Sequence, residues 1–147
     1  MHRLLLSLFL FSFASSIVYA KDNMYHGALA YQAARCISYI ELAGKQGDVE
    51  YIDLFNLFYK NMNKYIDSIE VDTQSYRVNK KLKVPLYWHI YVSENKFPRD
   101  VLVGRILEWT TGIESERVGS EFSKNEKVIP ESAGELAYKN ANCALLH

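Results

Sequence analysis

The pattern of apolar and polar positions predicts helices over most of the chain after its first twenty residues. In the stretch 24–45, apolar residues recur at steps of three and four, the spacing that places side chains on one face of a helix. Gly44 and Gly47 then end this helix, and Asp48 is a suitable N-cap for the next one. We expect the polar side chains of the first helix to face solvent: Arg35, Ser38, Glu41 and Lys45.

The second predicted helix has the clearest amphipathic pattern in the chain. It follows Asp48, and its polar residues lie opposite a wide apolar stripe. The stripe consists of Val49, Ile52, Phe55, Phe58, Tyr59, Met62, Ile66 and Ile69. We expect these large side chains to form the centre of the hydrophobic core, although such a stripe is also the kind of surface that lines a groove for an apolar ligand.

A third helix is predicted to start near Pro98, because proline is tolerated in a first helical turn, and to run to about residue 117. Its expected inward residues are Leu102, Ile106, Trp109 and Ile113. Gly104 lies in mid-helix, where glycine costs about 1 kcal/mol relative to alanine. A close approach of a neighbouring backbone would explain the glycine, so we expect tight helix packing at this point.

The last predicted helix begins at Ser132, after Pro130. Ser132 and Glu135 have the spacing of a capping box, which satisfies backbone N–H groups at a helix start. Leu136, Asn140 and Cys143 would then share one face of this helix.

Residues 83–93 do not follow the helical period. Apolar and polar positions alternate here, and β-branched and aromatic residues are frequent, as in a strand. The one candidate partner strand is the weak segment 75–78, and a two-stranded hairpin is marginal unless it packs on other elements. A hairpin, an extended arm and a short helix all remain open for residues 75–93.

The first twenty residues read as a cleaved secretory signal peptide. Arg3 precedes an apolar run, and the small residues Val18 and Ala20 fit the positions before a cleavage site. The apolar core is about half as long as a membrane span requires, and no later segment is long and apolar enough to span. We therefore expect residues 1–20 to be removed, and residues 21–147 to form one domain in the periplasm or outside the cell.

Composition excludes one class of partner. The chain has 17 basic and 17 acidic residues and a formal net charge of zero, whereas nucleic-acid-binding domains are typically basic. The one lysine cluster, formed by Lys80, Lys81 and Lys83, is more typical of a solvated loop. No nucleic-acid partner is expected.

The two cysteines predict a disulfide. Cys36 lies in the first predicted helix and Cys143 in the last, and an exported chain reaches an oxidising compartment. The bond would join the two helices and close a loop of about a hundred residues, which on the chain-entropy model stabilises by roughly 4.7 kcal/mol. A redox-active pair would need cysteines close in sequence or an exposed thiolate, and nothing in the sequence provides either.

No pattern of residues predicts catalysis, a metal site or a cofactor. After the signal peptide the histidines are His26, His89 and His147, and none of them is spaced to share a metal with another. Glu41 and Glu108 are conceivable as a carboxylate pair for glycan cleavage, but each is more simply a helical surface acid.

The most suggestive feature for function is the alternate face of residues 85–93, which carries Tyr87, His89 and Tyr91. If the opposite face is buried, these side chains stand together outward, and clustered aromatic residues commonly anchor protein partners. In the simpler interpretation both faces are covered, and the tyrosines place their hydroxyls at the core boundary.

A cysteine in the first helix after a signal peptide, the pair Gly104-Arg105, and a cysteine near the end together resemble small exported helical proteins of bacteria. The arrangement is also similar to periplasmic immunity proteins, which protect a cell from toxins that attack the cell wall. This resemblance is architectural and implies a non-enzymatic inhibitor or immunity protein.

The sequence thus predicts a mainly α fold, a bundle of about four helices closed by the disulfide, with the hairpin or arm near 75–93. The expected function is binding of another exported protein. Two alternatives remain open: a periplasmic chaperone or stress protein that exposes apolar surface on acidification, and an envelope hydrolase with an unrecognised site.

Overall fold

The computed structural model describes residues 25–71, 84–123 and 129–146, and it is helical throughout these ranges apart from short connections. The predicted signal peptide, the segment 75–78 and the lysine cluster lie outside them. The first helix covers residues 25–42. It is followed by α2 (Val49–Val71), α4 (Leu86–Glu94), α5 (Arg99–Ser123), α6 (Pro130–Asn140) and the 3-10 turn η1 (Cys143–Leu145). Each of the predicted helices has a counterpart, and α4 is an addition to them.

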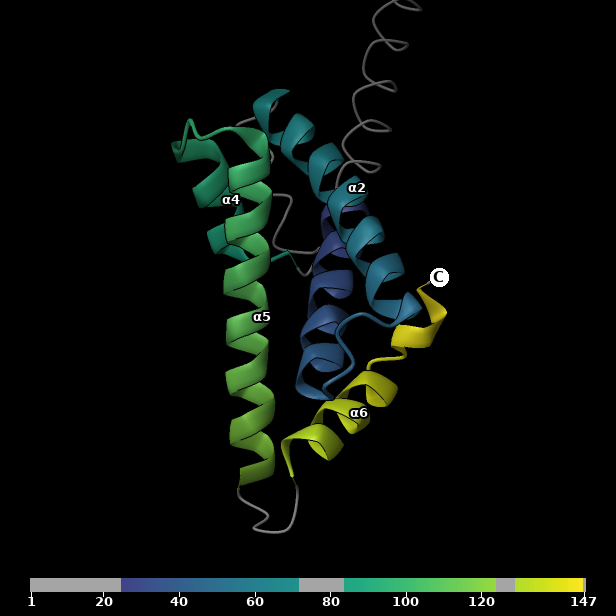
Figure 1. Ribbon diagram of the computed structural model, residues 1–147. Coiled ribbons are helices and arrows are strands. Elements are labelled where there is room, and N and C mark those ends of the chain that lie inside the picture. Colours follow the sequence, from purple (N-terminus) through teal and green to yellow (C-terminus); the bar gives the residue numbers. More distant parts are fainter. Residues whose placement is uncertain (1–24, 72–83, 124–128, 147) are drawn as a thin grey trace, which may run out of the picture.

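The helix 25–42 occupies the centre of the molecule, with α2, α5 and α6 around it (Figure 1). Within residues 33–40, every side chain except that of Arg35 is almost fully buried: Ala33, Ala34, Cys36, Ile37, Ser38, Tyr39 and Ile40. Burial of such a run on all sides of a helix requires neighbours in every direction. The prediction that Ser38 faces solvent is therefore wrong. Its hydroxyl donates to the Thr111 carbonyl of α5 at 2.9 Å.

Glycines end the central helix as predicted. Gly44 and Gly47 adopt φ angles of 70° and 109°, a left-handed conformation that other residues rarely adopt. Asp48 then directly precedes α2, and its carbonyl accepts the amides of Tyr51 and Ile52. The turn reverses the chain, so that α2 runs back along the central helix (Figure 1).

The helix α2 buries only part of its predicted stripe. Phe58, Met62, Ile66 and Ile69 lie in the core, together with Leu54 and Tyr65, which the stripe did not include. The N-terminal part of the stripe stays in solvent contact: Val49, Ile52, Phe55 and Tyr59 are 74%, 52%, 39% and 40% exposed. The prediction that the whole stripe forms the core is wrong, because the core contacts follow the face of Leu54, Phe58 and Tyr65.

Residues 86–94 form a helix, so the strand predicted over 83–93 is wrong for this part and the short helix is the alternative that the structure adopts. Trp88 is fully buried and is the anchor of α4. Its ring meets the rings of Tyr31, Phe58 and Tyr65, with centroids 5.6, 6.3 and 6.2 Å away. Val92, one turn later, is buried on the same side.

The inward face of α5 is rotated from the predicted one. Leu102 and Ile106 are buried as expected, but Trp109 and Ile113 are 42% and 51% exposed. Thr110, Glu114 and Val118 take the inward positions instead. Gly104 faces open space, with nothing within 4 Å of an added Cβ, so the tight packing predicted there is absent.

Close helix packing occurs instead at Gly134 of α6. A Cβ at this position would lie 2.6 Å from the amide nitrogen of Ala43 and 2.7 Å from the Tyr39 carbonyl oxygen. The helix α6 begins at Pro130, with Ile129 as its N-cap, so the predicted capping box at Ser132 is wrong. The helix also ends at Asn140, before Cys143, and Leu136 and Asn140 are exposed.

Candidate functional site

The two tyrosines singled out in the sequence come together on α4. Tyr87 and Tyr91 are separated by one helical turn, and both contact the Trp109 ring of α5, with centroids 6.3 and 4.6 Å away. Phe97, from the connection between the helices, lies 6.5 Å from the Tyr91 ring. We call Tyr87, Tyr91, Phe97 and Trp109 the aromatic cluster. Its rings are half-buried or exposed, so it forms part of the surface.

His89 does not join the tyrosines. A helix turns about 100° per residue, so a residue two positions from Tyr87 and from Tyr91 points away from both. His89 is only 8% exposed, and its burial lowers the pKa of the imidazole. The three side chains therefore do not stand together as an outward group, as the strand interpretation required. Trp109, which completes the cluster, was missed because the helical pattern placed it inward.

Thr110 fixes the position of the aromatic cluster on the core. Its hydroxyl donates to the Ile106 carbonyl within α5 at 2.7 Å. The same oxygen accepts the buried Trp88 indole N–H at 3.0 Å and lies 2.9 Å from the Tyr87 hydroxyl. One buried hydroxyl thus joins α4 to α5. The Tyr87 hydroxyl lies against it, while the Tyr87 side chain as a whole stays partly exposed.

The two helices that carry most of the aromatic cluster also expose apolar side chains to solvent. Leu86 and Ile90 of α4 are 49% and 42% exposed, although in a strand they would share the face opposite Tyr87 and Tyr91, which the outward interpretation required to be buried. Val101 and Ile113 lie two turns before and one turn after Trp109 on α5 and are 45% and 51% exposed. Large apolar side chains on both of the packed helices α4 and α5 are thus in contact with solvent.

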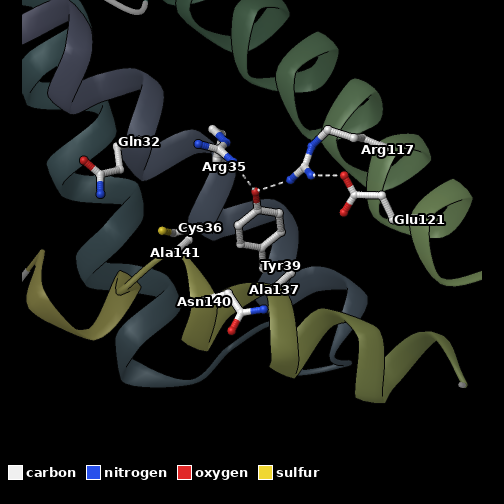
Figure 2. Close-up of a pocket in the computed structure, with 9 residues that line it drawn as sticks. All are labelled: Gln32, Arg35, Cys36, Tyr39, Arg117, Glu121, Ala137, Asn140 and Ala141. Atoms are coloured by element: carbon white, nitrogen blue, oxygen red, sulfur yellow. Dashed lines mark hydrogen bonds and ion pairs between the residues drawn. The ribbon is translucent and has the colours of Figure 1, made fainter.

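A second group of polar side chains lies deeper, between the central helix and α5. Two arginines converge on one phenol: the Tyr39 hydroxyl accepts Arg35 Nη2 at 2.9 Å and Arg117 Nη2 at 2.7 Å (Figure 2). The same hydroxyl donates to Glu114 Oε2 at 2.8 Å. Arg117 also reaches the exposed carboxylate of Glu121 through Nη1, at 2.8 Å.

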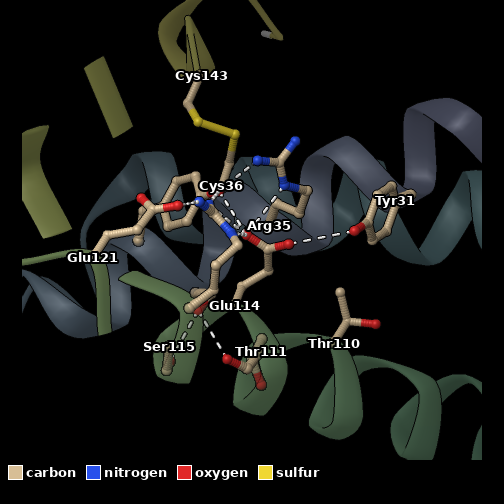
Figure 3. A network of polar contacts seen from close by, with 12 residues as sticks. Tyr31, Arg35, Cys36, Thr110, Thr111, Glu114, Ser115, Glu121 and Cys143 are labelled. Carbon is tan, nitrogen blue, oxygen red and sulfur yellow. Dashed lines mark hydrogen bonds and ion pairs between the residues drawn. A yellow bond between two sulfur atoms is a disulfide. The ribbon is translucent and has the colours of Figure 1, made fainter. Parts of the chain in front are cut away.

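Glu114 is the centre of this polar group, and its side chain is 5% exposed (Figure 3). Arg117 donates to it from Nε and Nη2 at 3.0 and 2.8 Å. Arg35 Nε lies 3.2 Å away as an ion pair without hydrogen-bond geometry, and the Tyr31 hydroxyl donates at 3.3 Å. A buried carboxylate is thus paired with two cations, as burial of a charge requires.

The pKa values in this group follow from the contacts. Burial alone would raise the pKa of Glu114, but the hydrogen bonds from Arg117 and Tyr39 and the charge of Arg35 outweigh it, so that the pKa lies below its usual range. Burial, together with the negative charge of Glu114, raises the pKa of Tyr31 to about 12. Glu114 is therefore a charged structural acceptor near neutral pH, and both phenols keep their protons.

The predicted disulfide is present beside this group. Cys36 and Cys143 are bonded, their Cα atoms are 5.7 Å apart, and both residues are buried (Figure 3). Cys143 reaches the central helix from η1 and not from the last helix itself. The bond therefore ties the chain that follows α6 to the middle of the bundle.

The acids considered as a catalytic pair have separate partners. Glu41 accepts the Tyr51 hydroxyl at 3.1 Å, and its partial burial raises its pKa. Glu108 is paired with Arg105 of its own helix at 2.8 Å. Within the described part of the chain, no three or more His, Cys, Asp and Glu residues are placed to hold a metal ion.

None of the helices in the described ranges is both long and apolar enough to cross a membrane. In comparisons with protein-family models, with curated proteins and with solved structures, nothing matches this chain. The geometry of the chain itself is therefore the basis for any functional assignment.

Proposed function

We propose that this chain is an exported, non-enzymatic binding protein of inhibitor or immunity type, and that it binds another exported protein through the aromatic cluster. The observation that carries the proposal is the position of Trp109, 42% exposed and in contact with Tyr87 and Tyr91. Aromatic side chains of this kind dominate the binding energy of protein interfaces when they are rigid and become covered.

The cluster has the construction that a binding surface needs. Tyr87 is held by Thr110, so its ring is ordered before a partner arrives and loses little conformational entropy on binding. Leu86, Ile90, Val101 and Ile113 form an apolar border that a partner would cover. Exposed large apolar side chains on both helices that carry the aromatic cluster support an interaction site.

Two substitutions on this surface test the proposal. Ile90→Glu and Ile113→Glu each place a charge beside the aromatic cluster, at residues that are 42% and 51% exposed, so folding should be little affected. A tagged wild-type chain should co-purify one envelope protein from the cells that produce it. Each variant should lose that protein, with at least a tenfold weaker affinity in a binding assay with the purified partner.

The matched control is Ile52→Glu, the same change at a residue of α2 that is 52% exposed. It should retain the partner at the wild-type level. Loss of the partner in the control, or its retention in both test variants, would place binding elsewhere. N-terminal sequencing of the recovered wild-type chain also checks export, since cleavage after Ala20 leaves Lys21 as the first residue.

A further inference from the structure

The helix α2 lies on the outside of the bundle, beside the central helix (Figure 1), and leaves large apolar and aromatic side chains uncovered. We call Val49, Ile52, Phe55 and Tyr59, which are between 39% and 74% exposed, the α2 face. The Phe55 and Tyr59 rings are stacked, with centroids 6.4 Å apart. The Tyr59 hydroxyl donates to Asp100 of α5 at 2.7 Å. The aromatic part of the α2 face is thus held in place before anything covers it.

Charged side chains border the α2 face, acidic toward the start of the helix and basic further along. They are Glu50, Asp53, Lys60 and Lys64, and all four are exposed. None of the four takes part in an ion pair within the described ranges. Because a helix turns about 100° per residue, Asp53 and Lys60 lie only about 20° apart around its axis. They therefore stand on the same edge of the α2 face, with Glu50 and Lys64 further round on the same side.

This separation of charge does not stabilise a single copy of the helix. Opposite charges on one helix support each other at a spacing of three or four residues, but neither Asp53 nor Lys60 has an opposite charge at that spacing. Asp53 and Lys60 are about 10 Å apart along the axis, too far for contact. The helix dipole favours an acid in the first turn and falls off beyond it, so it accounts for Glu50 alone.

A second copy of the chain provides the missing opposite charges. When two copies of one helix pack antiparallel across a two-fold axis, each edge of the face meets the same edge of the partner in the reverse direction. With the axis close to residues 56 and 57, Asp53 of one copy lies level with Lys60 of the other, and Glu50 with Lys64. The symmetry forms each of these pairs twice. A parallel arrangement would instead place like charges at the same level.

We propose that the α2 face binds a second copy of this chain as an antiparallel, two-fold symmetric pair. The charge register brings Ile52 of each copy within one helical turn of Tyr59 of the other. Apolar contacts then supply the attraction, and the charged edge sets direction and register. Four apolar or aromatic side chains per copy make a small interface, so we expect a dissociation constant of about 10–100 µM. The aromatic cluster of α4 and α5 takes no part in this pairing.

Sedimentation velocity of the purified chain between about 5 µM and about 1 mM tests the pairing, because a dimer forms by mass action. The wild type should shift from monomer to dimer over this range. Asp53→Lys and Lys60→Asp each bring like charges together and should weaken the dimer at least about tenfold. The double variant Asp53→Lys/Lys60→Asp restores opposite charges and should dimerise as the wild type does. An equimolar mixture of the two single variants should form a heterodimer for the same reason.

The matched control is Glu116→Lys, the same change of charge at an exposed acid of α5, and it should dimerise as the wild type does. Ile52→Glu should weaken the dimer but keep the envelope protein bound at the aromatic cluster, so the two proposals fail separately. Thermal unfolding shows that each surface variant remains folded. A wild type that stays monomeric at the highest concentration would overturn the pairing. So would a double variant and a mixture that dimerise no better than the single variants.

Discussion

At the scale of single residues, Thr110 and Glu114 account for the rotated inner face of α5. The apolar residues Trp109 and Ile113 each precede one of these polar residues, so the apolar pattern predicted an inner face of α5 that contains Trp109 and Ile113 and excludes Thr110 and Glu114. The structure buries the two polar residues because each has partners on another helix: Trp88 and Tyr87 of α4 for the hydroxyl, and Arg35 and Tyr39 of the central helix for the carboxylate. Trp109 is displaced to the surface as a result, and the aromatic cluster forms.

Glu114→Gln should destabilise the chain by about 2–3 kcal/mol at pH 7, because Arg35 and Arg117 lose the negative charge that neutralises them. The loss stays below that of a fully buried ion pair, since both arginine side chains are about one-third exposed and can bind water instead. The folded pKa of Glu114 lies below its usual range, so its contribution is complete above about pH 4.3, the unfolded value, and is lost as the pH falls through the folded value. Urea unfolding at pH 7 and pH 3 should show the difference between variant and wild type shrinking in acid. A difference that is independent of pH would contradict the assignment of a charged Glu114, and Glu116→Gln serves as the surface control.

At the scale of elements, the sequence defines the long helices well and the short one poorly. Gly44, Gly47 and the apolar period were sufficient to predict the central helix and the start of α2. In α4, apolar residues lie both on the side that packs into the core, with Trp88 and Val92, and on the side exposed to solvent, with Leu86 and Ile90. A short run that is apolar on both sides carries no helical period, so its alternation does not distinguish a strand from a helix.

The candidate site could be predicted only in part for the same reason. Tyr87 and Tyr91 share a face in a strand and, one turn apart, also in a helix, so both readings place them together. His89 joins them in a strand alone. Trp109 and the Arg35–Glu114–Arg117 group depend on how two helices distant in sequence are rotated against each other, which a local pattern does not determine.

The glycines of α5 and α6 give a prediction at this scale. Gly104→Ala should stabilise by about 0.5–1 kcal/mol, because the new methyl group meets no atom and the unfolded chain loses freedom. Gly134→Ala should instead destabilise by about 1–3 kcal/mol, since its Cβ would meet the backbone of the central helix at 2.6 Å. Thermal unfolding of both variants checks the opposite signs, and equal signs would contradict the packing of α6.

At the scale of the whole molecule, the disulfide is the one covalent contact between the ends of the bundle. Cys36→Ser and Cys143→Ser should each destabilise by similar amounts, up to about 4.7 kcal/mol on the chain-entropy model for a loop of about 100 residues. The double variant should be no less stable than either single variant, because all three lack the same bond. Urea unfolding with and without reductant measures this, and a native wild type whose thiols label readily would contradict it.

The bond between Cys36 and Cys143 also changes the covalent topology of the chain. Residues 36–143 form a ring closed through two sulfur atoms, and the segments before and after it are tails that leave the ring at adjacent points. A protease that cuts one peptide bond inside the ring opens it without separating any fragment, and the mass grows by a single water. A cut in a tail releases a piece at once. The chain can thus be nicked by a protease between its helices and still remain one molecule, with both halves of the bundle held at the same sulfur bridge.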